Sequence, residues 1–64
     1  MGPAPDWISS KERLPDENIV VEAMMWYPKD GGGRVYELMW ANNLWWFSDG
    51  SMYVYFFPTH WRYQ

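Results

Sequence analysis

The residues with types suited to catalysis are few in this sequence, and most of them have a structural explanation. His60 is the only histidine, and there is no cysteine. Without a second histidine or a spaced carboxylate pair, His60 is better explained as a hydrogen-bonded structural residue than as a general base or a metal ligand. A serine acts as a nucleophile only with a base in reach, and Ser9 is better explained by helix capping. We therefore expect no enzyme, no metal site and no cofactor.

Two other features that often indicate a function are weak here. Residues 31–33 are three consecutive glycines, but they lack the following Lys-Ser/Thr and the helix of a phosphate-binding loop, so a hairpin tip explains them better. The acidic residues are scattered, which favours a solvated surface over an acidic patch that mimics DNA. With five Lys and Arg against eight Asp and Glu, the net charge is −3. This balance argues against direct binding to nucleic acid.

The aromatic content is the most informative feature. The 64 residues include six Trp, five Tyr and three Phe. A domain of this size has little interior, and Trp is rarely buried completely. Some rings should therefore lie at the surface, in a groove or between subunits. Stacking on a planar ligand and packing in a protein interface explain such rings equally well.

Two arginines are placed beside aromatic residues. Arg34 shares a predicted strand face with Tyr36 and Trp40, and Arg62 lies between Trp61 and Tyr63 in the sequence. A cation beside a ring can hold a base together with its phosphate, and it can equally anchor an interface. The candidate residues for binding a ligand or a partner are these two arginines and four of the aromatic residues: Arg34, Tyr36, Trp40, Trp46, Trp61 and Arg62.

The chain begins with a Pro- and Gly-rich segment, 1–6, which we expect to be a flexible lead-in to a single small domain over 7–64. Ser9 with Glu12 three residues later predicts a capping box and one helical turn at about 9–14. Pro15 ends this turn, because the residue before a proline avoids the helical region. The longest apolar runs are far shorter than a membrane span, and no signal peptide is recognisable, so no membrane partner is expected.

The rest of the sequence predicts strands. Four segments are rich in β-branched and aromatic residues and are separated by turn signals: 19–27, 34–41, 44–48 and 52–57. Residues 28–33 predict a flexible hairpin loop, while Asn42-Asn43 and Asp49-Gly50 predict tight turns. The tail, 59–64, can return along the sheet. The expected fold is mainly β: a small four-stranded antiparallel meander, twisted or curled towards a barrel, with one short N-terminal helical turn.

The two ends of the sequence carry a resemblance to a known family. Trp7-Ile8-Ser9 followed by Lys11-Glu12-Arg13-Leu14-Pro15-Asp16, and Thr59-His60-Trp61 near the other end, resemble the opening and closing motifs of a small phage and prophage family. That family is known as domain of unknown function 551. Its members usually continue His-Trp with Met-Pro-Leu-Pro, whereas this chain has Arg62-Tyr63-Gln64. The resemblance implies a phage-encoded accessory protein in the host cytoplasm, and it implies no particular activity.

Two hypotheses for the function follow. The first is a non-enzymatic counter-defence protein that binds and sequesters a nucleotide-like host signal through exposed aromatic residues and arginine, and that forms a homo-oligomer. The second is an inhibitor that binds a host protein through an aromatic and acidic surface. Under the first hypothesis, Arg34 or Arg62 must supply the positive charge for an anionic ligand, because the net charge is −3.

Overall fold

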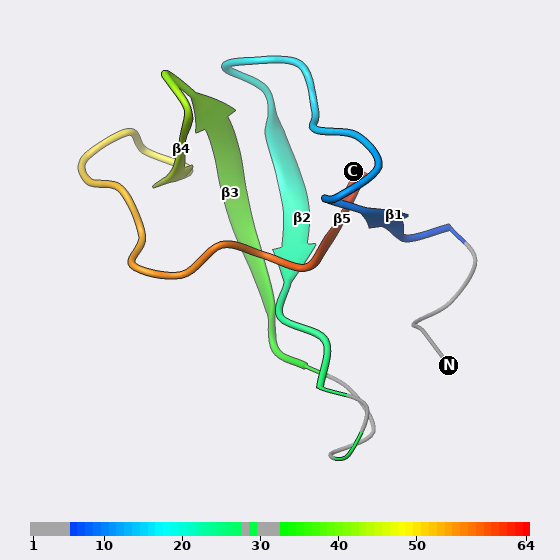
Figure 1. The fold of residues 1–64 in the computed structure, drawn as a ribbon. Helices are drawn as coiled ribbons and strands as arrows, with labels where there is room; N and C mark the ends of the chain where they lie inside the picture. The colour runs from blue at the N-terminus through cyan, green and yellow to red at the C-terminus, as the bar shows by residue number, and fades with distance from the viewer. Residues whose placement is uncertain (1–5, 28, 30–32) are drawn as a thin grey trace.

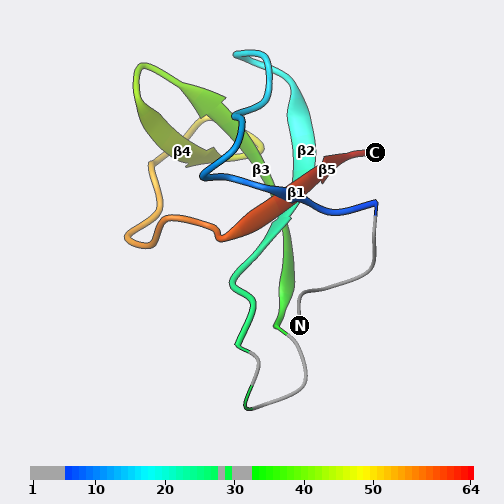
Figure 2. The same ribbon diagram turned by 45° about the vertical axis from the view of Figure 1, so that its right-hand side comes forward.

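A single twisted antiparallel sheet forms the frame of the molecule (Figures 1 and 2). The structure, a computed structural model, describes residues 6–27, 29 and 33–64. The five strands are β1 (Ile8–Ser9), β2 (Val20–Met24), β3 (Val35–Ala41), β4 (Leu44–Phe47) and β5 (His60–Tyr63). Their order in the sheet is β1-β5-β2-β3-β4, and the sheet does not close into a barrel. The prediction of a mainly β fold is confirmed.

Three of the predicted strands form the expected meander. β2 pairs with β3, and β3 pairs with β4, both antiparallel. Asn42 and Asn43 join β3 to β4 with φ values of 52° and 63°. Both residues thus have the positive φ that a two-residue hairpin turn requires and that asparagine tolerates. β3 and β4 are each one residue shorter than predicted, whereas β2 has five residues where the prediction of 19–27 has nine.

The predicted fourth strand at 52–57 is wrong, and the tail takes its place in the sheet. Beyond β4, the described chain keeps only one isolated bridge, between Trp46 and Tyr53. It then leaves the sheet edge and crosses to β5 (Figure 1). β5 lies between β1 and β2, so the sheet has five strands and not four. The segment leaves the sheet because Val54 and Phe56 pack on the core instead of extending the ladder.

The core lies on one face of the sheet. Its buried side chains come from four strands and from the 52–57 segment: Val21, Ala23, Leu38, Trp40, Trp45, Val54 and Trp61. Strand pairing places Ala23 beside both Tyr36 and Trp61, and Trp40 beside Trp45. Since side chains alternate across a strand, the neighbours of these residues point to the opposite face. We call that opposite face the outer face.

Two irregular segments cover the core. Segment 52–58 brings the ring of Phe56 to 5.1 Å from Tyr36 and the ring of Phe57 to 5.8 Å from Trp40. Segment 10–18 contains the buried Pro15 and bonds to the sheet, with the Asn18 amide donating to the Trp40 carbonyl at 2.9 Å. These two segments, which are not strands, therefore form the second layer of this small domain.

The predicted helical turn is present as one turn and does not extend. The amides of Glu12 and Arg13 donate to the Ser9 carbonyl at 3.0 and 3.2 Å, and the Lys11 amide donates to Ser9 Oγ at 3.3 Å. Residues 6–27, 29 and 33–64 contain no α-helix. The predicted lead-in at 1–6, apart from Asp6, and most of the predicted hairpin loop at 28–33 lie outside the described residues.

Candidate functional site

The first predicted arginine–aromatic cluster forms only in part. The Arg34 guanidinium carbon lies 5.3 Å from the Tyr36 ring centroid, on an exposed part of the chain. Trp40 shares that face of the strand but is buried, and its ring packs edge-on against Trp45 at 5.5 Å. Arg34 and Tyr36 therefore form a surface pair, while Trp40 belongs to the core.

The second predicted cluster does not form. Trp61 and Tyr63 point to the core face, where their rings meet at 5.0 Å, while Arg62 points to the outer face. There the Arg62 guanidinium lies over the Trp7 ring at 4.3 Å. Sequence neighbours on a strand face in opposite directions, so the ring beside Arg62 in space comes from a different segment.

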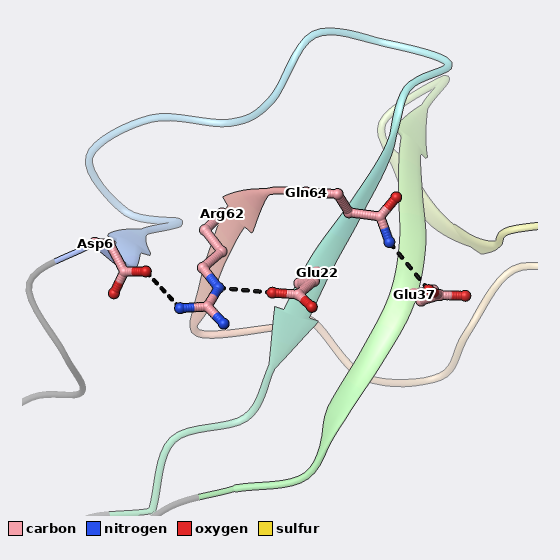
Figure 3. Close-up of polar contacts among 5 residues, drawn as sticks. All are labelled: Asp6, Glu22, Glu37, Arg62 and Gln64. Carbon is pink, nitrogen blue, oxygen red and sulfur yellow. Dashed lines mark hydrogen bonds and ion pairs between the residues drawn. The ribbon is translucent and has the colours of Figure 1, made fainter.

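Arg62 is held by carboxylates from two other segments. Its Nε donates to Glu22 at 2.6 Å, and its Nη1 is paired with Asp6 (Figure 3). The hydrogen bond that Arg62 donates to Glu22 is the main reason that the pKa of Arg62 is raised above its ordinary value. Figure 3 also shows a separate polar contact further across the sheet, in which Glu37 accepts a hydrogen bond from Gln64 at 3.0 Å. Arg62 is thus engaged in anchoring the chain that leads into β1.

The two remaining predicted residues differ in burial. Trp61 is completely buried, and its Nε1 donates to the Arg13 carbonyl at 2.8 Å. Trp46 lies half-buried on the outer face, donates from Nε1 to the Ala41 carbonyl at 2.9 Å, and packs edge-on against Tyr53. The six predicted residues are therefore spread over both faces and the core, and the structure does not bring them together.

A pocket of about 360 Å³ opens elsewhere, where the two ends of the sequence meet. β1 pairs with β5, which places Ser9 opposite His60 and Ile8 opposite Trp61. The residues that line the pocket come from the turn after β1, from the end of β2, and from the segment that enters β5: Ser9, Ser10, Lys11, Trp26, Phe57, Pro58, Thr59 and His60.

Thr59 organises the wall of this pocket. Its hydroxyl oxygen accepts a bond from the Trp26 amide at 2.7 Å and lies 3.3 Å from the Met24 carbonyl. The same oxygen is 2.9 Å from Nδ1 of His60. Thr59 also exchanges main-chain bonds, since its amide donates to Met24 at 2.9 Å and its carbonyl accepts from Ser10 at 2.9 Å. One residue thus fixes the positions of all three lining segments.

The pocket has few charged or unpaired polar groups. Burial lowers the pKa of His60, so the ring is neutral at pH 7. Lys11 is the only charged residue among the described lining residues, and it forms no ion pair within residues 6–27, 29 and 33–64. Ser10 Oγ is buried and has no hydrogen-bond partner in the described part of the chain. The pocket therefore carries one positive charge and one unused hydroxyl.

The pocket could not be predicted from the sequence, because the pattern at Ser9, Ser10 and Lys11 indicates only the start of a helix. The available signal was that both ends of the chain carry the family resemblance, and these ends prove to be neighbours in space. In the described ranges, no group of three or more His, Cys, Asp and Glu side chains is arranged to hold a metal ion. The same ranges contain no helix of the length and hydropathy needed to cross a membrane.

Comparison with known proteins gives one match. No curated protein and no solved structure matches the chain. The sequence pattern of one family, described as "Protein of unknown function (DUF551)", matches residues 6–63. This range includes all five strands and every residue that lines the pocket. The chain therefore belongs to the DUF551 family.

Proposed function

We propose that this protein is a non-enzymatic binding protein that takes up a planar, anionic, nucleotide-like molecule in the pocket formed by the turn after β1, the end of β2 and the segment that enters β5. As a phage accessory protein in the host cytoplasm, it would act by sequestering such a host signal. The observation that carries this proposal is the composition of the pocket: two aromatic residues, one unpaired cation and no carboxylate among the described lining residues.

The size of the pocket is compatible with such a ligand. At about 360 Å³ it lies at the lower end of the range for small-molecule sites, which is about 300–1,000 Å³. A nucleobase with its sugar fills this space, and a larger ligand would extend into solvent. Trp26 and Phe57 supply rings on which a base can stack, and each such contact contributes about 1–3 kcal/mol.

The charges favour an anion at one end of the pocket. Lys11 lies on the turn after β1, and no described acidic residue lines the pocket to oppose a phosphate. A hydrogen bond between a lysine and an ionised group contributes about 1.5–3 kcal/mol. The Ser10 hydroxyl costs free energy while it is buried without a partner, and a ligand group that reaches it recovers that cost. Together these contacts support dissociation constants between about 1 mM and 1 μM.

The test is a titration followed by backbone amide NMR, with adenosine monophosphate, guanosine monophosphate, ADP-ribose and a cyclic dinucleotide as probes. We expect saturable shifts in residues 9–11, 26 and 57–60 with at least one probe. Lys11→Glu should weaken binding by about tenfold or more, because it replaces attraction with repulsion. Arg34→Glu is the matched control, since it makes the same charge change at the exposed Arg34–Tyr36 pair.

Two results would contradict the proposal. One is the absence of shifts at the pocket with every probe at millimolar concentration. The other is loss of binding in Arg34→Glu with full binding in Lys11→Glu, which would move the ligand to the pair that the sequence suggested. The first result would favour the second hypothesis, an inhibitor that binds a host protein, whereas the second would keep a ligand-binding function but place its site at Arg34 and Tyr36.

A further inference from the structure

A row of large side chains lies exposed on the segment that crosses from β4 to β5. Met52, Tyr53, Tyr55 and Phe57 are 47%, 43%, 90% and 53% exposed, and we call these four residues the 52–57 surface. Between them, Val54 is buried and Phe56 is half-buried against Tyr36. Val54 and Phe56 hold the segment on the core. The rings of Tyr53 and Phe57 also contact tryptophans of the sheet with the parts that are not exposed, so the backbone of the segment is fixed.

The exposure of Tyr55 has no explanation within the described part of the chain. Its side chain is almost completely exposed, and no ring contact or hydrogen bond to it is formed by the described residues. A buried aromatic side chain removes about 150–250 Å² from water. At these exposures, the 52–57 surface offers on the order of 450 Å², about a tenth of the total accessible surface of 4497 Å². Patches of this size on small proteins often mark interaction sites.

The charge distribution separates this surface from the outer face. From residue 38 to residue 61, Asp49 is the only residue with a formal charge, although the whole chain carries −3. The outer face is different, because Asp6, Glu22 and Glu37 lie there around a single arginine (Figure 3). Two copies that meet through the outer face would bring carboxylates together, whereas two copies that meet through the 52–57 surface would not.

We infer that the 52–57 surface is the contact of a two-fold symmetric dimer, in which a second copy of this chain covers the same four residues. A two-fold contact uses one patch on both partners, so an uncharged aromatic patch is complementary to itself. Tyrosine, phenylalanine and methionine are enriched in such contacts, and charged residues are depleted at their centre. The area is about half of the ~800 Å² per partner in a stable complex. The dimer is therefore in concentration-dependent equilibrium with the monomer.

The test is sedimentation velocity on the full chain without any nucleotide, from low micromolar to near-millimolar concentration. The weight-average mass should rise from the 7.8 kDa of one chain towards twice that value. Tyr55→Lys should raise the midpoint concentration by about tenfold or more, since it places a charge in the centre of the contact. Val35→Lys is the matched control: Val35 is 48% exposed on β3, and its replacement should leave the midpoint unchanged.

The inference is overturned if the wild-type protein stays at one chain mass throughout, if assembly continues beyond two copies, or if the two lysine variants behave alike. Circular dichroism on both variants shows whether they are folded, and Tyr55 is too exposed for its replacement to disturb the core. Amide shifts that change with concentration should map to residues 52–57 and not to Glu22 or Glu37. Phe57 belongs both to the 52–57 surface and to the lining of the pocket, so the measurement is made without ligand and the variants are placed at Tyr55 and Val35, which do not line the pocket.

Discussion

Replacement of Trp61 by phenylalanine tests whether this side chain is the centre of the fold and not a surface binding residue. Trp61 is 0% exposed, its Nε1 donates to the Arg13 carbonyl at 2.8 Å, and its ring packs edge-on against Tyr63 at 5.0 Å. Phenylalanine keeps a ring in the core, but it removes the hydrogen-bond donor and leaves a space. Trp61→Phe should therefore lower the free energy of unfolding while preserving the fold.

The magnitude follows from these two losses. The hydrogen bond contributes about 0.5–1.5 kcal/mol. The smaller ring leaves a space of roughly 40 Å³, which at about 24 cal/mol per Å³ costs ~1 kcal/mol. Together they amount to about 1.5–2.5 kcal/mol. A chain of this length is stable by about 3–10 kcal/mol in total, so the change should be large in relation to the whole.

Trp46→Phe is the matched control, because it removes an equivalent hydrogen bond from a half-buried ring. Trp46 Nε1 donates to the Ala41 carbonyl at 2.9 Å, but no core cavity opens when the outer ring is reduced. Its expected cost is about 1 kcal/mol. Urea unfolding followed by far-UV circular dichroism measures both variants without relying on the fluorophores that they remove. Equal costs, or a larger cost for Trp46→Phe, would refute the assignment of Trp61 to the core.

Three further predictions concern single interactions. Thr59→Val should lower the free energy of unfolding by about 1–3 kcal/mol, because the partly buried Trp26 amide loses its acceptor at 2.7 Å. Thr59→Ser, which keeps the hydroxyl, should cost clearly less in the same urea assay. A double-mutant cycle with Arg62→Met and Glu22→Gln should give only a small coupling that weakens in high salt, since both side chains are about one-third exposed. A large or salt-independent coupling would contradict this. Burial lowers the pKa of His60, so as the pH falls the unfolded chain binds a proton before the folded chain does. The stability that neutral His60 contributes to the folded chain is therefore complete above its ordinary pKa of 6.5, and it is lost as the pH falls through the pKa of the folded state. The difference in unfolding free energy between wild type and His60→Gln should therefore shrink below pH 6.5, with a slope of at most about 1.4 kcal/mol per pH unit, and a difference that grows in acid would show the opposite linkage.

Local patterns in the sequence were sufficient to predict the meander of β2, β3 and β4. The alternation of Tyr36, Leu38 and Trp40 with Glu37 and Met39 assigns the two faces of β3, because side chains alternate along a strand. The turns were equally readable, since few residues other than glycine tolerate a positive φ. Asn42 and Asn43 have it, and Gly50 has a φ of 74° in the Asp49-Gly50 turn.

Pairing between segments that are far apart in the sequence could not be predicted from local patterns. Residues 52–57 have a strand-like composition, and the alternation of Val54 and Phe56 with exposed neighbours is present, but β4 offers them only the bridge at Trp46 and Tyr53. The position of β5 between β1 and β2 depends on contacts across most of the chain. The candidate site was missed for the same reason, because its residues come from three separate segments. The aromatic ring that lies beside Arg62 could not be predicted either, because this contact depends on how the strands are paired and not on adjacency in the sequence.

The two motifs that carry the family resemblance can be divided by what each residue does in the fold. Trp61 fills the core, and Thr59 connects β5 to the end of β2, so the fold alone accounts for both. It does not account for the Lys11 side chain, which forms no ion pair with the described residues, or for the Ser10 hydroxyl, which lies buried without a partner there. These two groups border the same pocket, and neither stabilises the described structure. The ligand site proposed above therefore depends on these two side chains, and not on the residues that hold the walls of the pocket together.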